Sequence, residues 1–561
     1  MKTDHTYDAI VVGSGMSGGW AAKELTAQGL TTLVLERGRE LQHVQDYPDA
    51  LKAPWQFKYG GHLTREEKEN YPIQSRKYNF DASSKHFFVN DQQHPYIQEK
   101  PFYWFRGYQT GGRSLLWGRG AYRFSDLEFE ANLKDGVGSD WPIRYKDIAP
   151  WYDYVENFIG VAGSKENIWQ FPDGQFLKPF ELNHAEKVVK DRIETHYKDR
   201  KLIPNRVAHL TELKPGQFKG RYACQARNLC HRGCPYGAYF SSNSSTLPAA
   251  AETGKLTMIS HAIVESVIYD QAKDRATGVR VIDAQTKETT EYHARVIFLC
   301  ASTIHSTAIL LNSKTERFSQ GLANSSGVLG HYLMDHHSRI SGVGTLEGYK
   351  DRIYKGSRPA MTAIPRFRNV DKQETDFLRG YGVWGGASRV KIDAGQVGIG
   401  ADLKEKLVKY GPWKMSLGCQ AETLPYFNNK VEIDPEHRDQ WGMPMIKISA
   451  AYGDNERLMR KDIAEQIQEM LEVAGLQDIR MTITEPVFGD TVHEMGTARM
   501  GRDPKTSVLN AYNQCHDVPN LFVTDGSCMV SSGNVSTSLT YMALTARACD
   551  YAVKQLNRGE I

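Results

Sequence analysis

The sequence predicts an α/β fold in which a Rossmann-like nucleotide-binding domain is interleaved with an α+β domain built on an antiparallel sheet. Three observations predict it. A glycine-rich strand–turn–helix–strand unit opens the chain, alternating strand patterns fill residues 340–455, and further apolar strands follow near residues 296 and 521. The first domain is therefore expected to draw on both ends of the chain.

The opening unit has the pattern of a dinucleotide-binding fold. Residues 7–12 form a short apolar run typical of a buried parallel strand, and Gly13-Ser14-Gly15-Met16-Ser17-Gly18 follows it. A helical pattern continues to residue 28, and a second strand, residues 31–35, ends at Glu36. Such glycines let the backbone approach a pyrophosphate at a helix N-terminus, and the acid accepts hydrogen bonds from the ribose. We predict Gly13, Gly15, Gly18 and Glu36 as cofactor-binding residues, and the position of the motif at the start of a long chain favours FAD over NAD.

A second glycine-rich stretch occupies residues 107–118. Adjacent glycines before a short apolar run indicate close packing of the backbone against a flat object, although a tight turn would use the same residues. We predict a second flavin contact here, through Gly111, Gly112 and Ser114.

The middle of the chain has the alternation of an antiparallel sheet, which would form one wall of a substrate pocket. The predicted strands are residues 340–345, 360–367, 414–421, 430–433 and 445–449. An amphipathic helix follows, with Asp454 as its cap and Gly475 at its end, and its apolar face belongs to the core. The predicted FAD-binding domain comprises residues 1–40, 105–135, 225–335 and 490–561. The predicted substrate domain, with its covering loops, comprises residues 41–104, 136–224 and 336–489.

Composition excludes several classes of protein. The 561 residues are 40% hydrophobic and 24% charged, which is enough to bury a sizeable core and is not typical of a disordered chain. A formal net charge of +3 gives no reason to expect a nucleic acid or an anionic membrane as partner. No apolar run of about 18 residues occurs, so no membrane-spanning helix is expected. No signal peptide or twin arginine is visible, so the expectation is a cytoplasmic protein, or a periplasmic one that a signal-bearing partner subunit carries.

Three of the eight cysteines are clustered as Cys224-x5-Cys230-x3-Cys234, which is ligand-like spacing. Zinc would require a fourth ligand, for which His231 is a poor candidate because it adjoins a ligand. An iron–sulfur cluster binds thiolates, and such motifs often end in Cys-Pro. A loop of reduced thiols is the alternative. Residues 326–337 contain three histidines, but without a carboxylate at helical spacing they do not predict a metal site.

Two loops near the C-terminus hold the candidate catalytic residues. His493 lies in a glycine-punctuated loop, residues 491–501, and Asn534 lies in a loop of small residues, 531–537. Either residue alone would be ordinary in a loop or a core. Together they become candidate active-site residues, because the predicted nucleotide-binding domain brings the C-terminal part of the chain back to the cofactor.

With these motifs assembled, the chain resembles the glucose–methanol–choline (GMC) family of FAD oxidoreductases over nearly its whole length. The motifs that carry the resemblance are residues 13–18, 107–118, 326–336, 422–431, 491–501, 518–527 and 531–540. The resemblance implies that His493 is the catalytic histidine and that Asn534 is the second active-site position. It also implies FAD contacts from Val264, Asp525, Gly526 and Val535. Arg113 departs from the small residues usual at its position, and no His or Thr for covalent attachment is evident, so FAD is expected to bind non-covalently.

Within the family, residues 111–118 and 141–156 are more similar to bacterial sugar and gluconate dehydrogenases than to fungal oxidases. The cysteine spacing is similar to the loop that holds a [3Fe-4S] cluster in bacterial glucose, fructose and glycoside 3-dehydrogenases. The resemblance thus implies oxidation of a sugar or glycoside alcohol, with the C3 hydroxyl preferred. It also implies electron transfer through the cluster to a cytochrome c acceptor, with a small accessory subunit as a further partner. The alternatives are a flavin oxidase that uses oxygen, a gluconate or polyol dehydrogenase, a non-catalytic flavoprotein subunit and a nicotinamide-dependent dehydrogenase.

Overall fold

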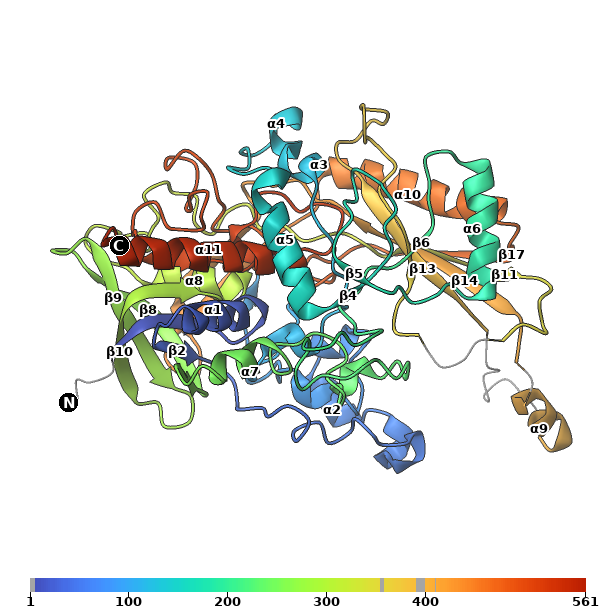
Figure 1. Cartoon of the computed structure of the whole chain (residues 1–561), viewed down its shortest axis with the longest axis horizontal. Coiled ribbons are helices and arrows are strands. Elements are labelled where there is room, and N and C mark those ends of the chain that lie inside the picture. The colour runs from blue at the N-terminus through green and yellow to red at the C-terminus, as the bar shows by residue number, and fades with distance from the viewer. Residues whose placement is uncertain (1–5, 354–357, 390–398, 409) are drawn as a thin grey trace.

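The computed structural model describes residues 6–353, 358–389, 399–408 and 410–561, and it has two lobes side by side (Figure 1). One lobe contains a mostly parallel sheet with helices packed around it, and both the first strand and the last helix belong to it. The other lobe is an antiparallel sheet with two helices on one face. The predicted fold class is therefore confirmed.

The nucleotide-binding lobe is built on a seven-stranded sheet with the order β7-β2-β1-β10-β9-β8 and with β18 beside β10. Five of its strands run parallel, and β8 and β9 extend the sheet as an antiparallel pair. The strand bounds are Thr6–Val12 (β1), Thr32–Leu35 (β2), Leu256–Ile259 (β7), Ala262–Asp270 (β8), Arg275–Asp283 (β9), Thr289–Leu299 (β10) and Leu521–Val523 (β18). One sheet thus gathers strands from near the beginning, the middle and near the end of the chain.

Strand β1 explains why this lobe forms. Ala9 and Val11 pack into the core on one face of the sheet, and Ile10 and Val12 pack into the core on the other. A strand buried on both faces needs the continuous apolar run that the sequence provides. Four helices pack around the sheet: Met16–Ala27 (α1), Thr246–Ala251 (α7), Thr303–Asn312 (α8) and Ser538–Arg558 (α11). Helix α1 connects β1 to β2 and lies against α11, the last helix of the chain.

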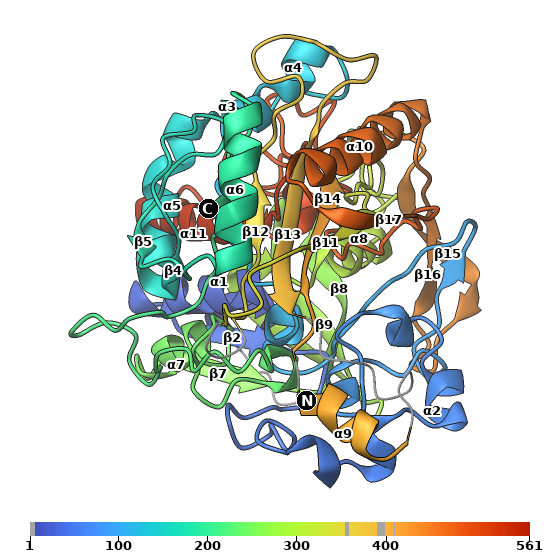
Figure 2. The same ribbon diagram turned by 90° about the vertical axis from the view of Figure 1, so that its right-hand side faces the viewer.

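The second lobe is built on a six-stranded antiparallel sheet with the order β17-β11-β14-β13-β12-β6. Its strands are Ile203–Pro204 (β6), Ile340–Leu346 (β11), Thr362–Ile364 (β12), Tyr381–Arg389 (β13), Trp413–Ala421 (β14) and Gln477–Ile483 (β17). Helices His184–His196 (α6) and Asp454–Val473 (α10) pack on the sheet (Figure 2). Along β13, Tyr381 and Val383 pack into the core beneath these helices, while Trp384 points to the opposite face and lines a cavity.

Two details of the second lobe correct the prediction. Strands Lys430–Arg438 (β15) and Pro444–Ser449 (β16) do not join the six-stranded sheet, but form a separate sheet with Ile97–Gln98 (β3). Strands β15 and β16 pair with each other. An antiparallel pair shows the same alternation of apolar and polar residues in either sheet, so the sequence pattern could not tell which sheet they join. The cap of α10 is Gly453 and not Asp454, because the Glu456 carboxylate accepts the Gly453 N–H at 2.7 Å while Asp454 pairs with Arg457.

The remaining elements are short or cover the two lobes. They are Arg65–Asn70 (α2), Asp126–Phe129 (α3), Ala131–Asp135 (α4), Tyr145–Ile159 (α5), Ala401–Val408 (α9), Val161–Ala162 (β4) and Phe176–Leu177 (β5). In the part of the chain that the structure describes, no helix combines the length and the apolar character needed to cross a bilayer.

Candidate active site

A cavity of about 500 Å³ lies between the two lobes. The carboxyl ends of the parallel strands form one wall through residues 12–17, 35–37, 300–303 and 525–526. Trp384 and Gln420, from strands β13 and β14, line the wall that faces the second lobe. Ligands of open α/β sheets bind at the carboxyl ends of the strands, so this cavity is the expected position of a nucleotide cofactor and its substrate.

The first glycine-rich loop has the geometry of a pyrophosphate cradle. Gly13 has a φ of +95°, and a Cβ added there would lie 2.6 Å from the Cys300 carbonyl oxygen. A Cβ on Gly18 would lie 1.8 Å from the Gly13 carbonyl oxygen, so Gly18 lets helix α1 pack against the loop. A Cβ on Gly15, at the helix N-terminus, would meet no atom within 4 Å. Gly13 and Gly15 line the cavity, and Gly18 lies behind them. The open space in front of the backbone N–H groups of this loop, at the N-terminus of α1, fits a pyrophosphate.

Glu36 is fixed by the same loop at the end of β2. Its Oε2 accepts hydrogen bonds from the Ser14 N–H at 3.1 Å and from the Ser14 hydroxyl at 2.5 Å, and its Oε1 accepts the Gly38 N–H at 2.8 Å. Burial raises the pKa of Glu36. The carboxyl group lines the cavity, where it is placed to meet ribose hydroxyls.

The second glycine-rich stretch packs directly on the first. The Gly111 N–H donates to the Ser14 hydroxyl at 2.9 Å, and the Ser114 hydroxyl donates to the Gly111 carbonyl at 2.6 Å. Gly111 has a φ of +85°, and a Cβ there would lie 1.7 Å from Oδ1 of Asn243. Gly112 and Ser114 line the cavity, whereas Gly111 does not.

Three of the four FAD contacts implied by the resemblance line the cavity: Val264, Asp525 and Gly526. Asp525 accepts hydrogen bonds from the hydroxyls of Ser306 at 2.5 Å and Ser527 at 2.6 Å, and burial raises its pKa. Val535 does not line the cavity and is buried in the main core.

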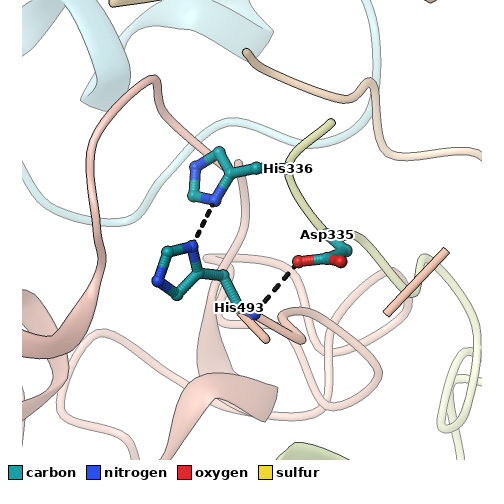
Figure 3. Close-up of side chains that lie close together, drawn as sticks. All are labelled: Asp335, His336 and His493. Carbon is teal, nitrogen blue, oxygen red and sulfur yellow. Dashed lines mark hydrogen bonds between the residues drawn. The ribbon is translucent and has the colours of Figure 1, made fainter. Parts of the chain in front are cut away.

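His493 lines the cavity and is held by residues that precede strand β11. Its ring Nδ1 lies 3.0 Å from Nδ1 of His336, and its backbone N–H donates to Asp335 Oδ1 at 3.0 Å (Figure 3). Burial lowers the pKa of His493 well below its usual range, and the neighbouring His336, Lys77 and Arg113 lower it further. The ring is therefore neutral near pH 7 and able to accept a proton.

Asp335, His336 and His493 offer ligand atoms that all lie within 4.8 Å of one another. These atoms already have partners. The Asp335 carboxylate accepts hydrogen bonds from the N–H groups of His493 and Thr491, and each nitrogen of the His336 ring has a hydrogen-bonding contact. The three residues therefore form a hydrogen-bonded group.

The structure does not bring Asn534 into the cavity wall. Asn534 is buried, its Nδ2 donates to Oε1 of Glu128 at 2.9 Å, and its Oδ1 has no hydrogen-bond partner among the described residues. Burial, together with the neighbouring Glu422, raises the pKa of Glu128 to about 7. The loop of Asn534 is nevertheless linked to His493 through His336, because the Gly533 carbonyl oxygen lies 3.0 Å from Nε2 of His336 and His336 contacts His493.

Three charged residues at the cavity were not predicted as site residues. Arg113 donates two hydrogen bonds to the buried Glu494, at 3.1 and 2.7 Å, and so anchors the residue next to His493. Lys77 donates to the Asp490 carbonyl at 2.9 Å, and burial lowers its pKa. Because Arg113 departs from the small residues usual in the family, its position could have marked it as a site residue from the sequence. Lys77 lies in the irregular segment that covers the cavity, where no motif marks it.

The three clustered cysteines line a second, smaller cavity, and none of them forms a disulfide. Burial and the neighbouring thiols raise the pKa of Cys224 to about 11. Tetrahedral zinc places its sulfur ligands about 3.8 Å apart. Across the described residues, Asp335, His336 and His493 are the one group of three possible ligands that meets a 4.8 Å limit. The Sγ atoms of Cys224, Cys230 and Cys234 therefore do not all lie within 4.8 Å of one another.

Comparison with known protein families identifies the family of this chain. Two models described as GMC oxidoreductase match residues 214–338 and 425–545, and a model of an NAD(P)-binding Rossmann-like domain matches residues 11–74. The chain belongs to the GMC oxidoreductase family. It is an FAD-dependent oxidoreductase that acts on CH–OH groups, as the resemblance predicted.

Relatives of this GMC oxidoreductase align along nearly its whole length. It is 26% identical to the fructose dehydrogenase large subunit of Gluconobacter japonicus, with 98% of each chain covered. It is 27% identical to 2-methyl-1,2-propanediol dehydrogenase of Mycolicibacterium austroafricanum, with 98% of this chain and 96% of the relative covered. It is 25% identical to the gluconate 2-dehydrogenase flavoprotein of Pantoea cypripedii, with 93% and 89% covered.

Solved structures share the fold. Pyridoxine 4-oxidase from Mesorbium loti superposes with a TM-score of 0.57 at 16% identity, covering 98% of this GMC chain and 99% of the oxidase. The formate oxidase of Aspergillus oryzae RIB40 superposes with a TM-score of 0.60 at 12% identity, with both chains covered completely. At such identities the likeness concerns the fold alone.

The cradle predicts a specific effect of the Gly15→Ala substitution. The added methyl group meets no protein atom within 4 Å, so the stability of the FAD-free protein should not change. The methyl group would occupy the space of the pyrophosphate, so FAD should bind at least about tenfold more weakly, a loss of roughly 1.4 kcal/mol. Fluorescence titration with FAD and thermal unfolding measure the two quantities. Gly418→Ala in strand β14, whose added Cβ would lie 3.6 Å from its nearest neighbour, is the control. Unchanged FAD affinity of Gly15→Ala would exclude the α1 N-terminus from the FAD site.

Proposed function

We propose that this GMC oxidoreductase oxidises a secondary alcohol of a sugar or glycoside to a ketone, with the C3 hydroxyl as the preferred position. Its electrons leave through a [3Fe-4S] cluster held by Cys224, Cys230 and Cys234 to a cytochrome-type acceptor. The main support is that the pyrophosphate cradle and the neutral His493 line one cavity. Relatives named for fructose, gluconate and a diol support an alcohol substrate, and the pocket with the three cysteines supports the cluster.

His493 acts as the general base in this proposal. FAD, bound non-covalently, supplies the hydride acceptor. As the substrate C–H bond breaks, its hydroxyl proton passes to the His493 ring, so the alcohol loses one proton and one hydride and becomes a ketone. Asn534 is proposed to hydrogen-bond the same oxygen and hold it in line, once its amide turns away from Glu128. Arg113 holds the loop of His493 through Glu494.

The wall near Trp384 has the chemistry that binds sugars. The indole Nε1 of Trp384 donates to the Tyr122 hydroxyl at 2.9 Å, and that hydroxyl donates to Oδ1 of Asn205 at 2.5 Å. All three residues line the cavity, together with Gln420. An aromatic surface with a few oriented amides is suited to a ligand that has an apolar ring face and several hydroxyl groups.

Short contacts connect the flavin cavity with the cysteine pocket. Trp117 lines the flavin cavity, and its Nε1 donates to the Phe240 carbonyl at 2.9 Å. The Tyr239 hydroxyl donates to the Leu115 carbonyl at 2.9 Å, and the adjacent Ala238 lines the cysteine pocket. These contacts support passage of electrons from one pocket to the other. Because the Gluconobacter relative is named a large subunit, we also propose a small accessory subunit as partner.

The first experiment is an anaerobic visible spectrum of the purified protein before and after addition of methyl glucoside. We expect the flavin bands to bleach over a broad iron–sulfur absorbance, and chemical analysis of the product identifies the oxidised carbon. Fructose and gluconate tested in parallel distinguish the substrate class. Bleaching by gluconate alone would contradict the glycoside proposal. A flavin that no alcohol reduces would contradict the catalytic role, and stoichiometric peroxide in air would support an oxidase instead.

A further inference from the structure

His336 connects the two loops that hold the predicted catalytic pair. Its side chain is fully buried at 0% exposure. Its Nε2 lies 3.0 Å from the carbonyl oxygen of Gly533, the residue before Asn534. Its Nδ1 lies 3.0 Å from Nδ1 of His493, as Figure 3 shows. Both ring nitrogens are thus engaged, and each contact restricts where the protons of the two rings lie.

The proton positions follow from what each atom can do. A carbonyl oxygen only accepts, so Nε2 of His336 carries a proton and donates to Gly533. Burial lowers the pKa of His336 to about 4, so the ring is neutral near pH 7 and its Nδ1 is bare. The short contact between the two Nδ1 atoms requires one proton, which must then sit on Nδ1 of His493. Neutral His493 consequently has a bare Nε2, and no hydrogen bond from this nitrogen to another described residue is formed.

We propose that His336 is a positioning residue that selects the Nδ1-protonated tautomer of His493 and leaves Nε2 bare to accept the substrate proton. This deepens the proposed function and rests on it for the identity of the proton donor. In the step itself the substrate O–H bond would break as the Nε2–H bond of His493 forms, and FAD, when bound, would supply the acceptor for the hydride that leaves the substrate carbon. The His493 imidazolium that results keeps its Nδ1–H donated to His336, which stabilises the new positive charge.

The surroundings hold both rings in this arrangement. Asp335 accepts the N–H groups of Thr491 at 3.2 Å and His493 at 3.0 Å, so the residue before His336 fixes the backbone of His493. The Tyr452 hydroxyl donates to the His336 carbonyl at 3.0 Å. Gly533 has a φ of +64°, and a Cβ there would lie 2.7 Å from the Phe124 ring. Only glycine can therefore adopt the backbone conformation that points the carbonyl of residue 533 at His336.

Two substitutions of His336 separate tautomer selection from simple packing. His336→Leu removes the acceptor for His493, and we expect kcat to fall on the order of 100-fold while KM and the FAD absorbance stay unchanged. His336→Asn places an amide oxygen near the former Nδ1, so we expect kcat to recover to within about tenfold of wild type. Thermal unfolding of both variants reports whether the fold is intact. Equal kcat losses in the two variants would overturn the proposal, as would a wild-type rate in His336→Leu.

The tautomer of His493 can also be measured directly by NMR, without a substrate. Long-range ¹⁵N–¹H spectra of the FAD-loaded protein with ¹⁵N-labelled histidine distinguish bare from protonated ring nitrogens, and the His493→Gln variant assigns the signals of His493. We expect a bare Nε2 in wild type and in His336→Asn, and a signal shifted toward protonated Nε2 in His336→Leu. A protonated Nε2 in wild type would overturn the proposal. If no alcohol reduces the flavin but Nε2 is bare, the proposed function fails and the tautomer assignment stands.

Discussion

The substitution His493→Ala is expected to slow reduction of the bound flavin by substrate by roughly 10²- to 10⁴-fold, because the general base is lost. FAD should remain bound, since the pyrophosphate cradle and Glu36 lie on the nucleotide-binding lobe and make no contact with the removed ring. Anaerobic stopped-flow absorbance measures the rate of flavin bleaching, and the flavin-to-protein absorbance ratio measures FAD content.

The control for this prediction is His331→Ala. The His331 ring stacks on Phe427 and is not among the residues that line the cavity, so its removal should leave the reduction rate unchanged. Reduction of the flavin in His493→Ala at a near wild-type rate would remove His493 from the role of general base. A loss of FAD in that variant would mean that the ring has a structural role in the cofactor site.

The substitution Cys230→Ser is expected to abolish iron binding and to lower the rate of cytochrome c reduction by at least about 100-fold. Serine replaces a soft thiolate ligand by a hydroxyl, which iron–sulfur clusters bind poorly. Reduction of the flavin by substrate should continue at the wild-type rate, because the cysteines line a pocket separate from the flavin cavity. Iron and sulfide analysis, followed by steady-state assays with cytochrome c and with an artificial dye, measure the two parts of the prediction.

The control is Cys515→Ala. Cys515 is buried in the main core and lines neither cavity, so its removal should change neither the iron content nor the reduction of cytochrome c. Wild-type iron content in Cys230→Ser would contradict the assignment of Cys230 as a ligand. Absence of iron from the wild-type protein isolated anaerobically would contradict the cluster itself.

Local patterns were sufficient to predict the nucleotide-binding part of the fold. Strands β1, β2 and β18 match apolar runs of the right length, and Gly13 and Glu36 line the cavity as the motif requires. Strand β13 was missed because Gly382, Gly385 and Gly386 obscure its alternation. A Cβ at Gly385 would lie 1.9 Å from the Ser416 carbonyl oxygen, so glycine is a requirement of the sheet and not a sign of a turn.

The hydrogen-bonded environment of His493 could not be predicted from the sequence. His336 is separated from His493 by 157 positions, and the contact between them depends on how two loops meet in three dimensions. The same holds for Asn534, whose amide is donated to Glu128 across 406 positions. Motifs identify the residue types that the chemistry uses, whereas the proton positions and the buried partners depend on contacts between distant segments.

The packing of helix α11 against α1 has a consequence for biosynthesis. The Ser17 hydroxyl donates to the Thr524 carbonyl across 507 positions, and α11 covers α1 at residues that follow residue 537. The nucleotide-binding lobe therefore cannot be completed until the ribosome has translated the chain through helix α11. Until then β1 and α1 expose apolar side chains that the finished protein buries, and exposed apolar surface of this kind makes a folding intermediate prone to aggregate. Uptake of FAD is expected only after helix α11 has been synthesised and has packed against α1.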